Sequence, residues 1–314
     1  MKYFMYMLAL CGMLAGCALT SMNNTEVRNP APAPAPVEST DEHLGDPTFN
    51  SEVVEDTGPK ATDNAVVDAG NTIPAAIEPA ADEDLALGLL LMDEGKLRDA
   101  RARLTTVLGS EPSSTDEAEA LKALRSINQR IFLSTGVEGD LKLYTVKAGD
   151  TLERVARAHG TTWEMIQRLN GLDGTRINVG QELKILGGKF ELIVRKEKFV
   201  MDLMLDGAFI QRYEVGLGLQ GSTPLGEFTV KNRIPKPADG SYPYGHEKHR
   251  LGSRWLGLSS EAGHKGYGIH GCRAEEESQI PGECSQGCVR MKNGDIEEVY
   301  DIIPSGTRLV VIAR

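Results

Sequence analysis

The sequence lacks a surplus of positive charge, and it lacks an apolar run long enough to span a bilayer. Its 34 lysines and arginines are outnumbered by 45 acidic residues, which gives a net charge of −11. No basic patch stands out, so we expect no nucleic-acid partner. The apolar stretch at residues 3–13 is shorter than the roughly 20 residues that a membrane-spanning helix needs. With Lys2 before it, this stretch is typical of the core of an export signal.

The excess of acid belongs to one segment. Residues 18–84 carry 14 acidic residues against Arg28 and Lys60, whereas residues 85–314 hold 31 of each sign. A Pro-Ala alternation over residues 29–37 favours extended polyproline conformation. Because like charges repel, such a chain stays extended and soluble. We therefore interpret residues 17–81 as a disordered acidic tether that spans roughly 45 Å as a flexible coil.

Two short segments near the C-terminus combine the groups that acyl transfer needs. The first is Gly-Ile-His-Gly at 268–271, and the second is Ser-Gln-Gly-Cys-Val-Arg at 285–290, with His270 standing 18 positions before Cys288. A cysteine thiolate attacks carbonyl carbon well if a base activates it and donors hold the oxyanion. A thiol beside an imidazole can form a thiolate–imidazolium pair with a lowered thiol pKa. Gly287 leaves room for a substrate carbonyl and for backbone N–H donors.

This order and spacing, with the flanking glycines, resemble the catalytic motif of the L,D-transpeptidases (YkuD-type domains). Those enzymes cross-link bacterial peptidoglycan through a cysteine acyl-enzyme. The resemblance covers about residues 189–312 and includes the turn Thr-Pro-Leu-Gly-Glu-Phe at 223–228. One position departs from the pattern, because Gln286 stands where many members carry a second histidine. We expect Gln286 to alter the support of the site without removing its base.

The resemblance implies a role for each residue of the motif. Cys288 is the expected nucleophile and His270 the expected base. The Gly271 carbonyl is expected to orient the imidazole, and the N–H groups of Gly287 and Cys288 to hold the oxyanion. Ser285 and Arg290 are expected to help position the substrate. No metal, nucleotide or other cofactor is required by this chemistry.

The apolar pattern of residues 189–314 predicts a mostly-β catalytic domain. Strands are expected at 190–194, 199–205, 209–215 and 309–312. Asp206 and Gly207 form a hairpin turn between the second and third of these. The one convincing helix of the domain is Asn293–Ile302.

The segment Leu-Tyr-Thr-Val-Lys-Ala-Gly-Asp-Thr-Leu at 143–152 opens a resemblance to the LysM domain that runs to residue 186. It implies a small α+β domain over residues 142–187 with the order strand, helix, helix, strand. LysM domains bind glycans that contain N-acetylglucosamine, such as peptidoglycan. The resemblance places the glycan groove at Gly149, Asp150, Thr151, Leu152, Asn170 and Ile177. Asp150 or Thr151 also caps the first helix.

Residues 82–136 have helical periodicity and resemble a single tetratricopeptide-like unit. Leu87, Leu90 and Leu91 lie on one face, and Gly95 interrupts the run. The pattern continues at Leu97, Ala100, Leu104, Val107, Leu108, Ala120, Leu124, Ile127 and Ile131. One unit of this kind buries little surface alone. We therefore favour a helical spacer packed on a neighbouring domain over a partner-binding groove.

Leu14-Ala15-Gly16-Cys17 resembles the bacterial lipobox. The resemblance implies a signal peptide over residues 1–16, cleavage before Cys17 and a lipid anchor on that cysteine. Ala18 and Leu19 follow rather than Asp, which in a diderm bacterium favours the outer membrane. We expect a lipid-anchored protein of the cell envelope that faces the periplasm.

The remaining cysteines and histidines leave two questions open. If Cys288 stays free as the nucleophile, Cys272 and Cys284 can form a disulfide across a short polar loop. The alternative is a regulatory disulfide between Cys272 and Cys288. His246, His249 and His264 could suggest zinc, but the glycines and prolines of residues 240–252 favour a solvated active-site flap.

Taken together, the motifs predict a cell-wall L,D-transpeptidase with peptidoglycan as its partner, through glycan at the LysM domain and stem peptides at Cys288. One alternative is a carboxypeptidase or hydrolase, in which water resolves the same acyl-enzyme. Another is a non-catalytic wall-binding lipoprotein whose catalytic-like domain has decayed.

Overall fold

The computed structural model describes residues 81–132 and 139–314. The predicted signal peptide, the predicted lipidation site Cys17 and all but the last residue of the predicted tether lie outside the described residues. Within the described part of the chain, no helix combines the length and apolarity that crossing a membrane requires.

The segment that resembles a LysM domain has the predicted order of elements. It consists of β1 (Leu141–Thr145), α5 (Leu152–Ala158), α6 (Trp163–Asn170) and β2 (Glu182–Leu186), and β1 pairs with β2 antiparallel. The Thr151 side chain caps α5 by accepting the Arg154 N–H, and Thr162 caps α6 in the same way. Gly171 ends α6 in the left-handed conformation, with φ 59°.

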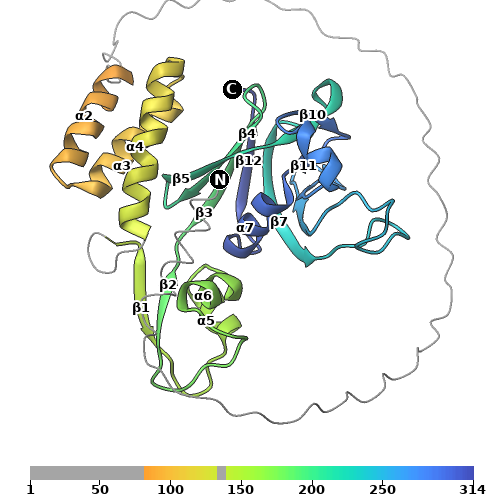
Figure 1. Ribbon diagram of the computed structural model, residues 1–314, viewed down its shortest axis with the longest axis horizontal. Helices are drawn as coiled ribbons and strands as arrows, with labels where there is room; N and C mark the ends of the chain where they lie inside the picture. The colour runs from red at the N-terminus through yellow and green to blue at the C-terminus, as the bar shows by residue number, and fades with distance from the viewer. Residues whose placement is uncertain (1–80, 133–138) are drawn as a thin grey trace, which may run out of the picture. The chain divides into compact units, whose positions relative to one another are not determined.

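The segment that resembles an L,D-transpeptidase domain is built on one ten-stranded sheet with the order β10-β6-β11-β9-β8-β7-β12-β3-β4-β5 (Figure 1). Its strands are β3 (Phe190–Arg195), β4 (Val200–Leu205), β5 (Ala208–Glu214), β6 (Gly216–Gly218), β7 (Gly226–Pro235), β8 (Arg254–Ser259), β9 (Gly268–His270), β10 (Gly282–Ser285), β11 (Val289–Arg290) and β12 (Arg308–Ile312). Two 3-10 helices, η1 (Leu219–Gly221) and η2 (Ala274–Gln279), and the helix α7 (Asn293–Ile302) complete it. The predicted mostly-β architecture is confirmed.

Local chemistry explains the predicted hairpin between β4 and β5. Asp206 and Gly207 both have positive φ, 50° and 79°. A two-residue turn with both central residues in this region matches the twist of the strands it joins, and Asp-Gly is a preferred pair for it. The apolar residues of β3 and β12 then alternate between buried and half-buried, and α7 contributes Ile296, Val299 and Ile302 to the same core.

The helical segment contains α2 (Ala81–Asp93), α3 (Leu97–Gly109) and α4 (Ser114–Phe132). The apolar residues predicted from Leu97 to Ile131 are buried. The prediction of which face of α2 is buried is wrong, because Leu87 and Leu90 are 38% and 55% exposed whereas Leu85 and Gly88 are buried. The reason is close packing on α3: a Cβ atom at Gly88 would lie 2.7 Å from Leu104 Cγ.

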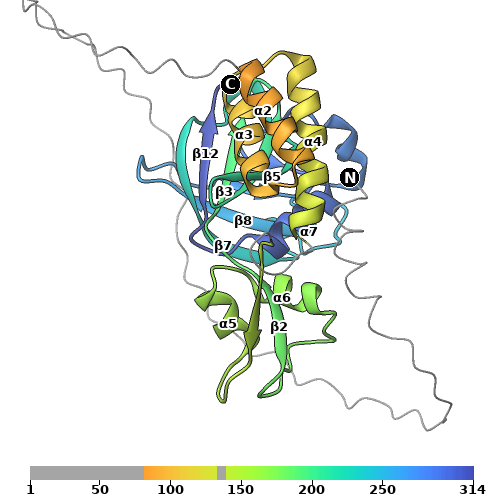
Figure 2. The ribbon, with the colours of Figure 1, turned by 90° about the vertical axis from the view of Figure 1, so that its left-hand side faces the viewer.

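These helices pack against the end of the sheet, and they cover the free edge of β5 (Figure 2). Asn128 Nδ2 donates to the carbonyls of Phe209 and Ile210, at 3.0 and 2.9 Å. The Phe209 N–H donates to Thr105 Oγ1 at 3.0 Å. Phe209 and Met204 belong to the apolar cluster of the helices. Side chains of α3 and α4 therefore pair backbone groups that an exposed edge strand would leave open.

Candidate active site

The pairing of two very short strands brings the segments of the predicted nucleophile and base side by side. β11 runs parallel to β9, with Val289 opposite Ile269 and Arg290 opposite His270. Arg290 and His270 therefore lie on one face of the sheet. Cys288 directly precedes β11, and its Sγ lies 3.8 Å from the carbonyl oxygen of Gly266, just before β9.

The turn before Cys288 is closed by a buried serine. Ser285 Oγ donates to the Cys288 carbonyl at 2.6 Å and accepts the Gly287 N–H at 3.0 Å. Gly287 has φ 130°, which favours glycine, and a Cβ atom there would lie 2.7 Å from Tyr267 Cε1. These contacts bear on two expected roles. Ser285, which is expected to help position the substrate, is 3% exposed, and its hydroxyl holds the turn. The Gly287 N–H is engaged with Ser285, which leaves the Cys288 N–H as the predicted oxyanion donor.

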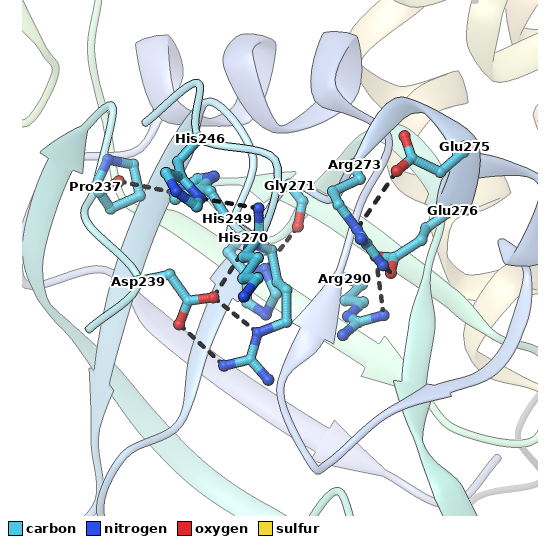
Figure 3. Close-up of polar contacts among 12 residues, drawn as sticks. Pro237, Asp239, His246, His249, His270, Gly271, Arg273, Glu275, Glu276 and Arg290 are labelled. Carbon is cyan, nitrogen blue, oxygen red and sulfur yellow. Dashed lines mark hydrogen bonds and ion pairs between the residues drawn. The ribbon is translucent and has the colours of Figure 1, made fainter. Parts of the chain in front are cut away.

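His270 is held in one tautomer. Its Nδ1–H donates to the Gly271 carbonyl at 2.6 Å, as expected, so Nε2 carries the lone pair that can accept a proton (Figure 3). The side chain is 4% exposed. The pKa of His270 is lowered to about 4, mainly by burial. The charge of Arg290 acts in the same direction, whereas the bond to Gly271 opposes the shift.

The thiol is also neutral at rest. Burial raises the pKa of Cys288, although the Gly268 N–H and the Arg290 charge act in the opposite direction. The thiol donates its hydrogen bond to the Gly266 carbonyl, with Sγ and O 3.8 Å apart. The expected thiolate–imidazolium pair is therefore not favoured in the resting site, because both ions would lose solvation. The arrangement suits proton transfer from sulfur to Nε2 during attack.

Arg290 and Gln286 occupy places that the motif alone does not reveal. The Arg290 side chain is 15% exposed, and Nη1 lies 3.5 Å from a carboxylate oxygen of Glu276 in η2. Glu276 also binds Arg273 (Figure 3). The Arg290 guanidinium, which is expected to help position the substrate, is therefore paired with an acidic residue of η2. Gln286 is exposed, and its side chain makes no hydrogen bond with any other described residue.

Asn293, the first residue of α7, was missed by the sequence reasoning. Its Nδ2 donates to the Cys272 carbonyl at 2.7 Å, and its Oδ1 accepts the Ser253 N–H at 3.0 Å. Its backbone N–H donates to Glu277 at 2.8 Å. These bonds tie the chain after His270 to the start of β8 and to η2. The sequence did hold a signal that could have identified Asn293: it is an asparagine at the start of the predicted helix, five residues after Cys288.

The loop between β7 and β8 lies beside His270, as the flap expectation proposed. Asp239 and Arg250 form an ion pair at 2.7 Å, and both charges influence His270. His249 Nε2–H donates to the Pro237 carbonyl at 2.8 Å (Figure 3). A cleft of about 290 Å³ separates this loop from the chain after His270, with Tyr244, His246 and Glu247 on one side and Arg273, Ala274 and Glu275 on the other. Among residues 81–132 and 139–314, no cluster of three or more potential metal ligands occurs.

The predicted disulfide between Cys272 and Cys284 is absent, and so is the alternative between Cys272 and Cys288. All three cysteines are free. The Cys272 thiol is buried and donates to the Met291 carbonyl, with Sγ and O 3.6 Å apart. Cys284 Sγ packs over Gly216, where a Cβ atom would lie 2.3 Å away. Burial raises the pKa of Cys272 to about 12, so this thiol is a poor nucleophile.

The LysM-like segment has a pocket of about 420 Å³ at the predicted groove. It is lined by Asp150, Thr151, Leu152, Glu153, Trp163, Thr175, Arg176 and Ile177. Of the predicted glycan contacts, Gly149 and Asn170 do not line it. Asn170 instead uses its amide to bind the backbone of Ile166 and Lys184 at 2.8 Å. The sequence reasoning missed Trp163, whose signal was an aromatic residue directly after a capping threonine.

Comparisons with known protein families match both segments. The family model for the L,D-transpeptidase catalytic domain (YkuD) matches residues 189–312, and the LysM model matches residues 144–186.

Relatives of known sequence cover the same region. The L,D-transpeptidase homologue YkuD of Bacillus licheniformis is 32% identical over 177 residues, which are 54% of this chain and 98% of that protein. YkuD of Bacillus subtilis is 29% identical over 175 residues, 54% of this chain and 97% of that protein. The N-acetylmuramoyl-L-alanine amidase sle1 of Staphylococcus epidermidis is 46% identical over 55 residues, 18% of this chain and 17% of the amidase.

Similar solved structures include an L,D-transpeptidase from Mycobacterium smegmatis, with 16% identity and a TM-score of 0.34. The match covers 43% of this chain and 65% of that one, so this chain spans just under two thirds of its length. An Enterococcus faecium L,D-transpeptidase gives 22% identity and a TM-score of 0.32, over 40% of this chain and 50% of that one. Assignment to a family rests on the sequence relatives, not on these two structures.

Proposed function

Because this chain belongs to the YkuD family of L,D-transpeptidases, we propose that it cross-links peptidoglycan stem peptides through an acyl-enzyme on Cys288. The observation that carries the proposal is the parallel register of β9 and β11, which sets Arg290 opposite His270 and brings Cys288, directly before β11, beside the chain that leads into β9. The bond from Nδ1 to the Gly271 carbonyl supports it, because it leaves Nε2 free to act as base.

The first half-reaction forms a thioester. Cys288 Sγ attacks the carbonyl carbon before the terminal D-alanine of a tetrapeptide stem, while its proton passes to His270 Nε2. The Cys288 N–H holds the oxyanion that develops. The C–N bond then breaks, and His270 returns the proton to the departing D-alanine amine. No metal or cofactor takes part.

The second half-reaction transfers the acyl group. The side-chain amine of a second stem's diamino acid, or an amine on an anchored protein, attacks the thioester carbonyl and gives its extra proton to His270. The C–S bond breaks, and Cys288 leaves as a thiolate that recovers the proton from the imidazolium. The neutral pair of the resting site is thereby restored.

We propose that the LysM domain holds the enzyme on glycan through the pocket that contains Trp163 and Asp150. We also propose a lipid anchor at Cys17, which would place the enzyme in the cell envelope on the periplasmic side. The acidic tether would then supply the reach from membrane to wall. These parts raise the local concentration of stems without changing the chemistry at Cys288.

Incubation with a purified tetrapeptide muropeptide tests the reaction. We expect cross-linked dimer and free D-alanine from the wild type, and neither product from Cys288→Ser. Trimmed tripeptide monomer without dimer would show that water takes the acyl group, as in a carboxypeptidase. Equal activity of the wild type and Cys288→Ser would overturn the proposal.

A further inference from the structure

Trp255 is the direct neighbour of His270 across the sheet. β8 and β9 are antiparallel, and their register pairs Trp255 with His270. The two rings stack, with centroids 5.6 Å apart and planes 22° from parallel. A cross-strand pair shares one face of the sheet, so the indole lies on the face that carries His270 and Arg290.

Two glycines make room for this indole. A Cβ atom on Gly268 would lie 2.6 Å from Trp255 Cη2 and Cζ2, and one on Gly257 would lie 2.8 Å from Nε1. Both distances are far below van der Waals contact, so the indole of Trp255 fits here only because Gly257 and Gly268 have no side chain. Gly268 is also the residue whose N–H faces the Cys288 sulfur. The indole therefore extends from the base toward Gly268, next to the nucleophile.

The charged groups that act on His270 come from two other parts of the chain. Arg290 approaches from β11, and Asp239 and Arg250 approach from the loop between β7 and β8. The Gly271 carbonyl binds Nδ1, and the neutral Cys288 thiol lies directly before the neighbouring strand β11. Trp255 adds an apolar ring to this environment. Without it, water could reach the face of the imidazole that the indole now covers.

We propose that Trp255 is a positioning residue for the catalytic base, which fixes the plane of the His270 imidazole and keeps water from one of its faces. The inference rests on the proposed function, because it assigns His270 as the base. Under this proposal, Trp255 is a specific structural cause of the burial that lowers the His270 pKa to about 4. A base with this pKa remains neutral, and so able to accept a proton, throughout the mildly acidic range.

The chain offers an internal probe of this contact, because it contains two tryptophans, Trp163 and Trp255. In a Trp163→Phe background, the fluorescence of Trp255 reports on the ring beside it, since a protonated imidazole quenches a stacked indole. We expect quenching as the pH falls through about 4, and no such transition in Trp163→Phe/His270→Ala. Circular dichroism over the same range separates this transition from acid unfolding. A His270-dependent transition near pH 6.5, or the same transition without His270, would overturn the inference.

Acylation by a carbapenem gives the second readout, measured against pH in the otherwise native chain. We expect Trp255→Leu to move the acid limb toward the ordinary histidine pKa of about 6.5, with a loss of roughly tenfold at pH 5.5 relative to pH 8. Trp255→Phe keeps an aromatic face and should restore most of the wild-type profile. A purely structural tryptophan would lower the rate equally at every pH, and that result would contradict the proposal.

The two readouts separate failure of this inference from failure of the proposed function. If the enzyme is not acylated at any pH, the proposed function fails, while the Trp255 titration still reports whether the indole and His270 interact. If acylation is normal but insensitive to Trp255 substitutions, the function stands and the positioning role is wrong.

Discussion

At His270 and Cys288, burial decides the protonation state more than mutual attraction does. Burial opposes both the imidazolium and the thiolate, so each group is neutral at rest. A cysteine–histidine pair is often pictured as a preformed ion pair, and the motif alone led to that expectation. The structure instead supports a general-base step in which the sulfur loses its proton as it attacks.

Ser285→Ala tests the role that the structure gives to the serine. The substitution leaves the buried Gly287 N–H unpaired and frees the Cys288 carbonyl. An unpaired buried donor costs about 1–3 kcal/mol. We expect a comparable loss in the free energy of unfolding, measured in urea, together with slower carbapenem acylation. Ser305→Ala, at an exposed turn residue, is the matched control. Slower acylation with unchanged stability would show that Ser285 contacts the substrate and does not stabilise the turn.

Sequence reasoning at the residue scale found the groups with chemistry of their own. Order, spacing and flanking glycines were enough to select His270 and Cys288. Trp255 and Asn293 escaped because their roles depend on partners 15 and 21 positions away in sequence, brought near by the sheet and by α7. From the sequence, the Gly287 N–H was assigned to the oxyanion. Its bond to Ser285 could not be foreseen, because that bond depends on the shape of the turn.

At the scale of elements, the edge of β5 explains why the helical segment is there. The sheet ends at β5, and an open edge invites pairing with other chains. α3 and α4 cover that edge with Thr105 and Asn128, and the ion pair of Glu117 with Arg212, at 2.6 Å, adds a charged contact. The helices therefore form part of the support of the catalytic sheet.

Two adjacent threonines on α3 form a matched test of this contact. Thr105 Oγ1 accepts the Phe209 N–H, whereas Thr106 is exposed and bonds back to the Ala102 carbonyl of its own helix. Thr105→Ala should destabilise the protein by about 1–3 kcal/mol, because it leaves a backbone donor of β5 unpaired. Thr106→Ala should change stability by less than about 0.5 kcal/mol. Urea unfolding of both variants measures the difference, and equal effects would show that the helices do not stabilise the sheet edge.

The elements that could be predicted are those with a local signal. The hairpin at Asp206-Gly207 follows from turn chemistry, and α7 follows from helical periodicity. The strands that build the site, β6, β9 and β11, have three, three and two residues. Periodicity cannot identify segments of this length, and their pairing joins parts of the chain that only the folded sheet brings together.

At the scale of the whole chain, the LysM domain packs against the catalytic domain. Leu141, Met165 and Leu169 belong to the same apolar cluster as the catalytic sheet, and Glu164 pairs with Arg233 at 3.1 Å. Deleting the domain would therefore expose part of the catalytic core. A substitution within the glycan pocket separates binding from support of the fold more cleanly than deletion does.

Trp163→Ala is the substitution of choice, with Arg176→Ala as a second variant in case the first disturbs the domain. Loss of an aromatic anchor should weaken sedimentation with insoluble peptidoglycan by roughly tenfold, the equivalent of about 1.4 kcal/mol. Turnover on insoluble wall should fall, while turnover of a small soluble muropeptide should stay at the wild-type rate. Equal losses on both substrates in both variants would show that the pocket supports the catalytic fold instead.

The central claim is that Cys288 is the nucleophile and that His270 activates it. Intact-mass and peptide analysis after exposure of the reduced, folded protein to a carbapenem tests it most directly, because the strained β-lactam carbonyl acylates an activated thiol. We predict a single adduct at Cys288, retained in Cys272→Ser and Cys284→Ser, abolished in Cys288→Ser and nearly abolished in His270→Ala at neutral pH. An adduct at Cys272 or Cys284, or no adduct in the wild type, would contradict the account.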